Sequence, residues 1–309
     1  MSAATTIPPS LMSLGHPLDL SPDCFGWFVD STPLLDNPPA LRERFAEDGY
    51  VFLAGALDGQ LVDQSRERML EQLHELGMLA PAAPITDGIA RTPWQPQSVH
   101  KLIHTNEPLR RLLYSGRMLE IHQLLAGSPI RHFDFTWIRA IGPGRGTAPH
   151  ADAVYMNRGT RRLVTAWTPL MEIPLHIGGL MVMPGSHRIQ RLRKYFAYDV
   201  DSYCENRPDR AAEDVHGWVG PLGDGKLTEN PALLQKGIGL PWLTAETYRP
   251  GDLLIFSLQT LHASLDNTSN RVRLSTDSRY QPADEPADPR WIGPNPTGHS
   301  VENRRAMIC

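Results

Sequence analysis

From about residue 128 onward, the chain consists of short runs rich in β-branched and aromatic residues, separated by turns that contain glycine and proline. Runs of this length and composition predict β-strands. The clearest of them lie at 130–141, 163–173, 180–183, 252–257 and 271–276. Because no helical pattern lies between the runs, the strands are expected to pair antiparallel, in a sandwich or jelly roll. We therefore expect residues 128–282 to form a jelly-roll core.

The first 127 residues have a different pattern. Residues 1–38 are rich in proline, which excludes a long helix and predicts an extended N-terminal arm on the body or a flexible leader. The segment 41–49 predicts a short helix that ends at its glycine, and Asp58 is the expected N-cap of a longer helix. Regularly spaced leucines in 107–125 predict further helix. The part 39–127 is therefore expected to be mainly helical.

A long segment, 188–249, interrupts the predicted strands. An insertion of this length in a β framework is typically a lid or a binding loop, and we expect a lid-like insertion here. It begins with a basic cluster, which is typical of a solvated face and leaves the binding of an anionic group as the alternative. The cluster consists of Arg188, Arg191, Arg193 and Lys194. With a C-terminal tail at 283–309, we expect residues 39–309 to form one domain.

Composition limits the possible partners. A formal charge of −4 provides no basic field for nucleic acid. Cys24, Cys204 and Cys309 lack Cys-x-x-Cys spacing, so neither a disulfide framework nor a thiolate zinc site is indicated. No signal peptide is visible, and no apolar run reaches the roughly 18 residues of a membrane span. We expect a cytoplasmic protein without a membrane partner, while the sequence leaves its oligomeric state open.

Two His-x-Asp triplets occur, at His150-Ala-Asp152 and His132-Phe-Asp134, and such a triplet is common by chance. On a strand, a spacing of two residues puts both side chains on one face, so either pair could reach one cation. His262, which follows the predicted strand at 252–257, offers a third ligand. Two imidazole nitrogens and one carboxylate oxygen form the facial triad suited to Fe(II). Around His132, aromatic residues alternate with polar ones, which is typical of a structural strand.

Several ordered motifs accompany the first triplet. They are Phe45-Ala-Glu-Asp-Gly-Tyr-Val-Phe-Leu53, Thr165-Ala-Trp167-Thr-Pro-Leu, Gly178-Gly-Leu-Met-Val-Met-Pro184-Gly-Ser-His187, Pro250-Gly-Asp-Leu-Leu-Ile-Phe256, Leu261-His262-Ala-Ser264, Arg271-Val-Arg273-Leu-Ser and Arg279-Tyr-Gln281. Together they resemble the phytanoyl-CoA dioxygenase family of iron and 2-oxoglutarate dependent oxygenases, over about residues 41–282. The resemblance implies a double-stranded β-helix, or cupin-like, core. It also implies Fe(II) held by His150, Asp152 and His262.

The resemblance further implies which residues bind 2-oxoglutarate, the co-substrate. Arg273 would hold its distal carboxylate with help from Ser264, and Trp167 would line the pocket. Lys101 loosely matches a lysine of the family's early segment. Arg271 and Arg273 lie two residues apart, so periodicity leaves both open as the carboxylate clamp, and the family spacing favours Arg273.

The implied reaction consumes 2-oxoglutarate and dioxygen, releases succinate and carbon dioxide, and oxidises a small organic molecule, most often by hydroxylation. The ligand set leaves desaturation, epoxidation and rearrangement open as outcomes of the same chemistry. A non-catalytic jelly roll that binds a small molecule is the alternative from another class. Loss of a ligand or of the arginine would favour that alternative, and all four residues are present. The fold does not fix the substrate.

Overall fold

The computed structural model describes residues 10–201, 225–296 and 298. Its larger sheet has the strand order β4-β12-β7-β14-β5, and β6 also pairs with β14. All of these pairings are antiparallel. The strands are β4 (Tyr50–Leu53), β5 (Ile130–His132), β6 (Trp137–Ile141), β7 (Val164–Pro169), β12 (Leu253–Ser257) and β14 (Arg273–Pro282).

A smaller, four-stranded sheet faces the first and has the order β13-β9-β10-β3. It is antiparallel except for β3, which runs parallel to β10 and brings part of the proline-rich N-terminal segment into the sheet. The double-stranded β-helix core is thereby confirmed. The remaining strands are β1 (Met12–Ser13), β2 (His16–Pro17), β3 (Phe25–Trp27), β8 (Ile173–Pro174), β9 (Leu180–Val182), β10 (Trp242–Thr244), β11 (Thr247–Tyr248) and β13 (His262–Ser264).

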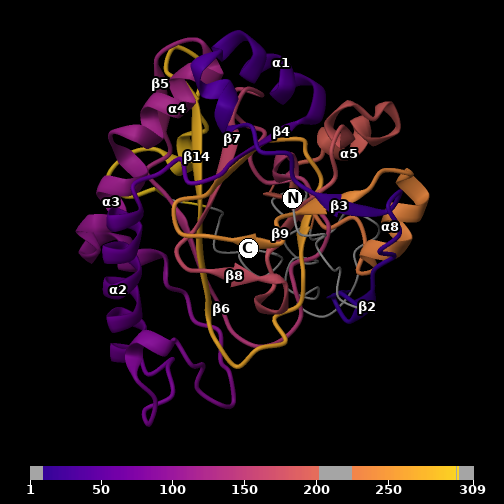
Figure 1. Ribbon diagram of the computed structural model, residues 1–309. Coiled ribbons are helices and arrows are strands. Elements are labelled where there is room, and N and C mark those ends of the chain that lie inside the picture. The colour runs from indigo at the N-terminus through magenta and orange to yellow at the C-terminus, as the bar shows by residue number, and fades with distance from the viewer. Residues whose placement is uncertain (1–9, 202–224, 297, 299–309) are drawn as a thin grey trace.

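Helices α2, α3 and α4 lie together on one side of the molecule, α1 lies at the top of this view, and α5 and α8 lie on the other side (Figure 1). In this group α2 contacts α3, α3 contacts α4, and α4 contacts β14. The α-helices are α1 (Pro38–Asp48), α2 (Gly59–Glu75), α3 (Glu107–Tyr114), α4 (Arg117–Ala126), α5 (Arg193–Phe196) and α8 (Pro231–Ile238). The 3-10 helices are η1 (Thr32–Asp36), η2 (Ile85–Asp87), η3 (His100–Thr105), η4 (Asp152–Val154), η5 (Leu175–Ile177), η6 (Ser186–Arg188), η7 (Gln190–Leu192) and η8 (Pro289–Trp291). Within the described segments, every helix is too short or too polar for a bilayer crossing.

The helix ends follow from local chemistry. The Asp58 carboxylate accepts hydrogen bonds from the backbone N–H groups of Gln60 and Leu61, at 2.9 and 3.3 Å, which confirms it as the N-cap of α2. Gly49 ends α1 in the left-handed region, at φ 78°. A Cβ at position 49 would lie 2.3 Å from the His187 ring, so both conformation and space require glycine there.

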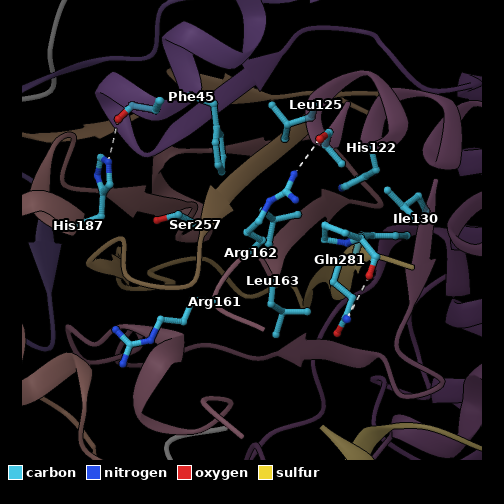
Figure 2. Close-up of a pocket in the computed structure, with 15 residues that line it drawn as sticks. Phe45, His122, Leu125, Ile130, Arg161, Arg162, Leu163, His187, Ser257 and Gln281 are labelled. Atoms are coloured by element: carbon cyan, nitrogen blue, oxygen red, sulfur yellow. Dashed lines mark hydrogen bonds between the residues drawn. The ribbon is translucent and has the colours of Figure 1, made fainter. Parts of the chain in front are cut away.

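Strand β14 separates two environments. All ten of its residues are buried, as expected for a strand covered on both faces. Arg279 faces the interior between the sheets, whereas Tyr280 faces α4 and stacks on His122 with ring centroids 3.8 Å apart. On this helix side, between α1, α4 and the ends of β7 and β14, lies a cavity of about 310 Å³ (Figure 2).

Candidate metal centre

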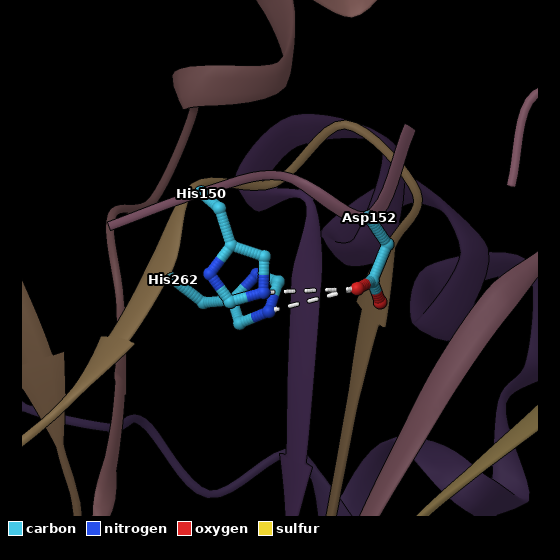
Figure 3. A group of neighbouring side chains, drawn as sticks. All are labelled: His150, Asp152 and His262. Atoms are coloured by element: carbon cyan, nitrogen blue, oxygen red, sulfur yellow. Dashed lines mark ion pairs between the residues drawn. The ribbon is translucent and has the colours of Figure 1, made fainter. Parts of the chain in front are cut away.

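Three side chains meet in the interior between the two sheets (Figure 3). Nε2 of His150 lies 4.0 Å from Oδ1 of Asp152, and Nε2 of His262 lies 3.8 Å from the same oxygen. All three residues are buried, and one potential ligand atom of each falls within 4.8 Å of the others. Among the described residues, this is the one group of three or more His, Cys, Asp or Glu side chains with such spacing.

The backbone brings the two histidines together. His150 and His262 exchange two N–H···O hydrogen bonds, at 3.0 and 2.9 Å, as an antiparallel bridge. The expectation that 150–152 forms a strand is wrong, because the chain turns into η4 at Asp152. There the backbone N–H of Ala153 donates to the carbonyl of Leu258 at 2.8 Å, which ties this turn to the segment preceding His262. The turn, and not strand alternation, directs Asp152 toward the histidines.

Each histidine presents one nitrogen to the shared space. Nδ1 of His150 donates to the Ala148 carbonyl at 2.7 Å, and Nδ1 of His262 donates to the Thr260 carbonyl at 3.0 Å. These bonds fix the proton on Nδ1 and leave the lone pair of Nε2 for a metal. Burial, together with the neighbouring His262 ring, lowers the pKa of His150 to about 3, and burial also lowers the pKa of His262. Both rings are therefore neutral near pH 7, as metal ligation requires.

The carboxylate of Asp152 is held through its other oxygen. Oδ2 lies 3.0 Å from Nη2 of Arg279 and accepts a hydrogen bond from the Thr165 hydroxyl. Burial alone would raise the pKa of Asp152, but the Arg279 guanidinium and the Thr165 hydroxyl lower it below its ordinary value. Asp152 is therefore ionised, with Oδ1 directed at the histidines.

This donor set fits a divalent iron ion. Two neutral imidazole nitrogens and one anionic oxygen are the ligands of the facial triad, which leaves coordination positions open for further ligands. A closed structural zinc site would instead have four protein ligands.

Arg273 fits an anionic co-substrate. Its side chain is buried, Nη1 donates to the Gly178 carbonyl, and Nε has no hydrogen-bond partner. Within the described part of the chain, no carboxylate lies within the 4.0 Å of an ion pair with it. Burial lowers the pKa of Arg273 to about 10, so the group remains charged at neutral pH. A buried guanidinium that no protein carboxylate contacts directly is a site that a ligand carboxylate would complete.

The structure separates Arg273 from its rival Arg271. The expectation that both lie on one face of a strand is wrong, because β14 begins at Arg273. Arg271 precedes β14, and its Nε donates to the Asp87 carbonyl at 2.9 Å, in a partly exposed position.

The other expected co-substrate residues are more scattered. Ser264 is buried in β13, and its hydroxyl accepts from the Thr147 N–H at 2.7 Å. Trp167 is buried in β7 and packs against Tyr248, with ring centroids 4.6 Å apart and the ring planes tilted by 59°. Lys101 is exposed on η3. The roles expected for these three residues stay predictions.

The second triplet does not form a comparable cluster. Nδ1 of His132 bonds the Phe133 carbonyl at 2.8 Å, and its ring stacks on Tyr114. Asp134 accepts from the Gly293 N–H at 2.6 Å. His187 contacts the Ala46 carbonyl through Nε2 at 3.1 Å. These side chains therefore serve local structure, as their sequence surroundings indicated.

Two contributors to the site were missed from the sequence. Arg279 and Thr165 both lie in motifs that marked the family resemblance, but neither was given a role there. Sequence spacing alone could have placed Arg279 at the site, because it lies six residues after Arg273 and thus on the same face of one strand. Its pairing with Asp152 required the register that puts Arg279 opposite Thr165.

Fold and site together define a non-haem iron oxygenase that uses 2-oxoglutarate. Comparison with family models agrees with this class, since residues 45–275 match the model of phytanoyl-CoA dioxygenase (PhyH). The chain belongs to this family. The reaction class therefore includes dioxygen and a small-molecule substrate.

Curated relatives and solved structures resemble the chain over most of its length. The 1-deoxypentalenic acid 11-beta-hydroxylases of Streptomyces exfoliatus and Streptomyces arenae are each 30% identical over 274 residues, covering 84% of this chain and 87% of the relative. The epimerase SnoN, solved with Fe3+, alpha ketoglutarate and nogalamycin RO, is 23% identical, with a TM-score of 0.54 over 84% of this chain and 93% of its own. EctD from S. alaskensis, solved with 2-oxoglutarate and 5-hydroxyectoine, is 18% identical, with a TM-score of 0.56 over 95% of this chain and 91% of its own. These two structures support the fold.

Proposed function

We propose that His150, Asp152 and His262 hold Fe(II) and that the enzyme hydroxylates a small organic molecule at the expense of 2-oxoglutarate and dioxygen. The observation that carries this proposal is the convergence of two buried Nε2 atoms on Oδ1 of one buried carboxylate. When bound, the iron supplies the redox chemistry that couples 2-oxoglutarate and dioxygen to oxidation of the substrate.

The protein's own contribution is position and charge. The Ala148 and Thr260 carbonyls orient the two imidazoles, and Arg279 and Thr165 orient the carboxylate. Burial of these groups keeps water away and strengthens each of their interactions. No residue of this set has to act as a general base.

For the co-substrate, Arg273 is the proposed clamp on the distal carboxylate. Its buried, unpartnered Nε supports this role over Arg271, whose Nε is already bonded to the Asp87 carbonyl. Ser264 and Trp167 are proposed to shape the same pocket from β13 and β7. Lys101 is proposed only as a contributor at its rim, since it is exposed on η3.

Hydroxylation is proposed over desaturation, epoxidation and rearrangement, because both relatives at 30% identity carry hydroxylase names. Their substrate, an acid by name, suggests organic acids as the first substrates to try. A non-catalytic binding protein is disfavoured because the triad and the arginine are all present and buried.

The proposal extends to organisation and location. Residues 39–309 are proposed to act as one oxygenase domain with a cytoplasmic location. The expected lid-like insertion 188–249 needs a correction at its C-terminal end, because β10 and β11 belong to the sheets. Much of this segment, 202–224, lies outside the described residues. A reducing compartment would suit three scattered cysteines and an Fe(II) centre.

The decisive experiment is anaerobic reconstitution. Addition of Fe(II) and then 2-oxoglutarate to the metal-free protein should produce a weak visible charge-transfer band, which the same additions to Arg273→Gln should produce only at higher 2-oxoglutarate concentration. A folded, iron-loaded protein that shows no band at saturating 2-oxoglutarate would overturn the co-substrate assignment. A screen of small carboxylic acids for stimulated succinate release would then identify the substrate.

A further inference from the structure

A second hollow adjoins the cavity on the helix side of the larger sheet. The first cavity, of about 310 Å³, has a mainly apolar wall that includes Phe45, Leu125 and Leu163 (Figure 2). The second has a volume of about 410 Å³ and shares Arg161 and His187 with the first. The two hollows are therefore neighbours with a common border, one apolar and one polar.

Strand alternation puts the apolar cavity behind the metal centre and apart from it. On β7, the Thr165 side chain contacts Asp152, while Val164 lines the cavity. On β14, Arg279 contacts Asp152, while Tyr280 lines the cavity. One sheet therefore separates the cavity from the proposed iron, so a molecule bound there would not be in the catalytic pocket.

The polar hollow is lined by three cations, Arg161, Arg188 and Arg193. Within the described residues, none of the three has an ion-pair partner within 4.0 Å, and the lining includes no acidic side chain. Arg193 makes a 3.3 Å hydrogen bond to Oε1 of Gln190, and Arg188 also borders a separate hollow that contains Asp48. Guanidinium groups gathered without a salt-bridged carboxylate attract an anion.

Neighbouring basic residues serve other purposes, which makes the three arginines distinct. Arg191, in the same cluster, donates to the carbonyls of Gly237 and Ile238 at the end of α8. Arg162, next to Arg161, pairs with Glu285 at 2.6 Å. Of the basic cluster noted in the sequence, only Arg188 and Arg193 therefore line the polar hollow.

We propose that these adjoining hollows form a second binding site, for an amphipathic organic anion. The apolar body of the ligand would fill the cavity between α1, α4 and the sheet, and its carboxylate would lie among Arg161, Arg188 and Arg193. The apolar cavity lies at the lower end of the range that small-molecule sites occupy, roughly 300–1,000 Å³. A medium-length acyl chain with one carboxylate matches the volume of the apolar cavity and would carry its negative charge into the polar hollow.

Decanoate is the probe that tests this site, with decan-1-ol as its uncharged counterpart. Binding is measured by calorimetry on the Fe(II)- and 2-oxoglutarate-loaded protein without oxygen, so that Arg273 is already occupied. Decanoate should bind, and the alcohol should bind about tenfold or more weakly, because it lacks the charge-assisted hydrogen bonds. Equal affinity for the two would overturn the proposal.

Three variants test whether decanoate binds in these two hollows. The double substitution Arg161→Ala with Arg193→Ala should weaken decanoate binding about tenfold or more, whereas Lys194→Ala, in the same cluster but outside the lining, should not. Ala46→Trp, at an exposed position of α1 that borders the apolar cavity, should also abolish binding by filling it. All three variants should keep the succinate formation of the parent protein. Decanoate binding that survives both Ala46→Trp and the arginine substitutions would assign the probe to another site and overturn the proposal.

Discussion

The guanidinium of Arg279 lies 3.0 Å from Oδ2 of Asp152, while the other oxygen of this carboxylate faces His150 and His262. The arginine is buried and lies over the ring of Trp137, 4.7 Å from its centroid. Its Nε and Nη1 have no hydrogen-bond partner, so the contact with Asp152 is its principal polar interaction. Oδ2 of Asp152 is therefore bound by the protein, and Oδ1 is available to a metal.

Arg279→Met should lower the free energy of unfolding of the metal-free protein by about 3–5 kcal/mol, because it leaves a buried carboxylate without its cation. Urea unfolding measures this loss. As a control, Arg117→Met on the surface of α4, which removes an exposed pair with Glu120, should cost less than about 1 kcal/mol.

A second substitution distinguishes charge from packing. Adding Asp152→Asn to Arg279→Met should restore part of the lost stability, since the uncompensated charge is then gone. If the double variant is as unstable as the sum of the two single variants, the contact of Arg279 with Trp137 and not the ion pair holds this region.

His150→Ala should abolish succinate formation, because one of three metal ligands is lost, whereas His132→Ala should retain it. His132 bonds the Phe133 carbonyl and stacks on Tyr114, so its loss affects only local packing. Succinate release in the presence of Fe(II) and 2-oxoglutarate is the measurement. The reverse pattern would move the metal to the second triplet.

Arg273→Gln should raise the 2-oxoglutarate concentration needed for half-maximal succinate formation by about tenfold or more, since a charge-assisted pair is lost. Arg271→Gln is the matched control and should leave this concentration nearly unchanged, because Arg271 bonds the Asp87 carbonyl outside the barrel. Iron affinity, titrated separately, should be similar in the two variants. Equal effects of both substitutions on 2-oxoglutarate would refute the assignment of the clamp.

Stability should fall as the pH falls from about 6.5 to 4, in part through His122. Burial lowers the pKa of His122 to about 4, below the 6.5 of the unfolded chain, so protons bind the unfolded state first. This histidine alone should cost about 2 kcal/mol between pH 7 and pH 5. His122→Phe, which retains a ring against Tyr280, should reduce the loss of unfolding free energy over this interval by that amount. An unchanged pH dependence would show that His122 does not titrate in this range.

Much of the fold could be predicted because local chemistry determines it. Gly49 ends α1 and Asp58 begins α2 where their backbone preferences require. The leucine-rich segment 107–125 is helical as predicted, and it is divided into α3 and α4 at Ser115 and Gly116. The strand runs were also found, although β14 extends to Pro282, well past the predicted segment. Its later residues are mostly polar and buried, so hydrophobicity gave no signal for them.

The metal ligands were predicted correctly as a cluster, but for a reason that is partly wrong. Strand alternation does not explain Asp152, since the chain turns there. Arg279 and Thr165 could not be joined to Asp152 without the register between β7 and β14. Pairing between distant strands depends on packing of the whole barrel, which a local pattern does not contain.

The backbone bridge between His150 and His262 has a consequence for how the protein acquires its metal. His150 and Asp152 leave the ribosome long before His262. The two histidines face each other only once β13 has returned beside the first triplet. A partly synthesised chain therefore has no complete iron site, whatever the iron concentration around it. Iron loading must wait until the barrel has closed, and bound metal would then stabilise only the finished protein.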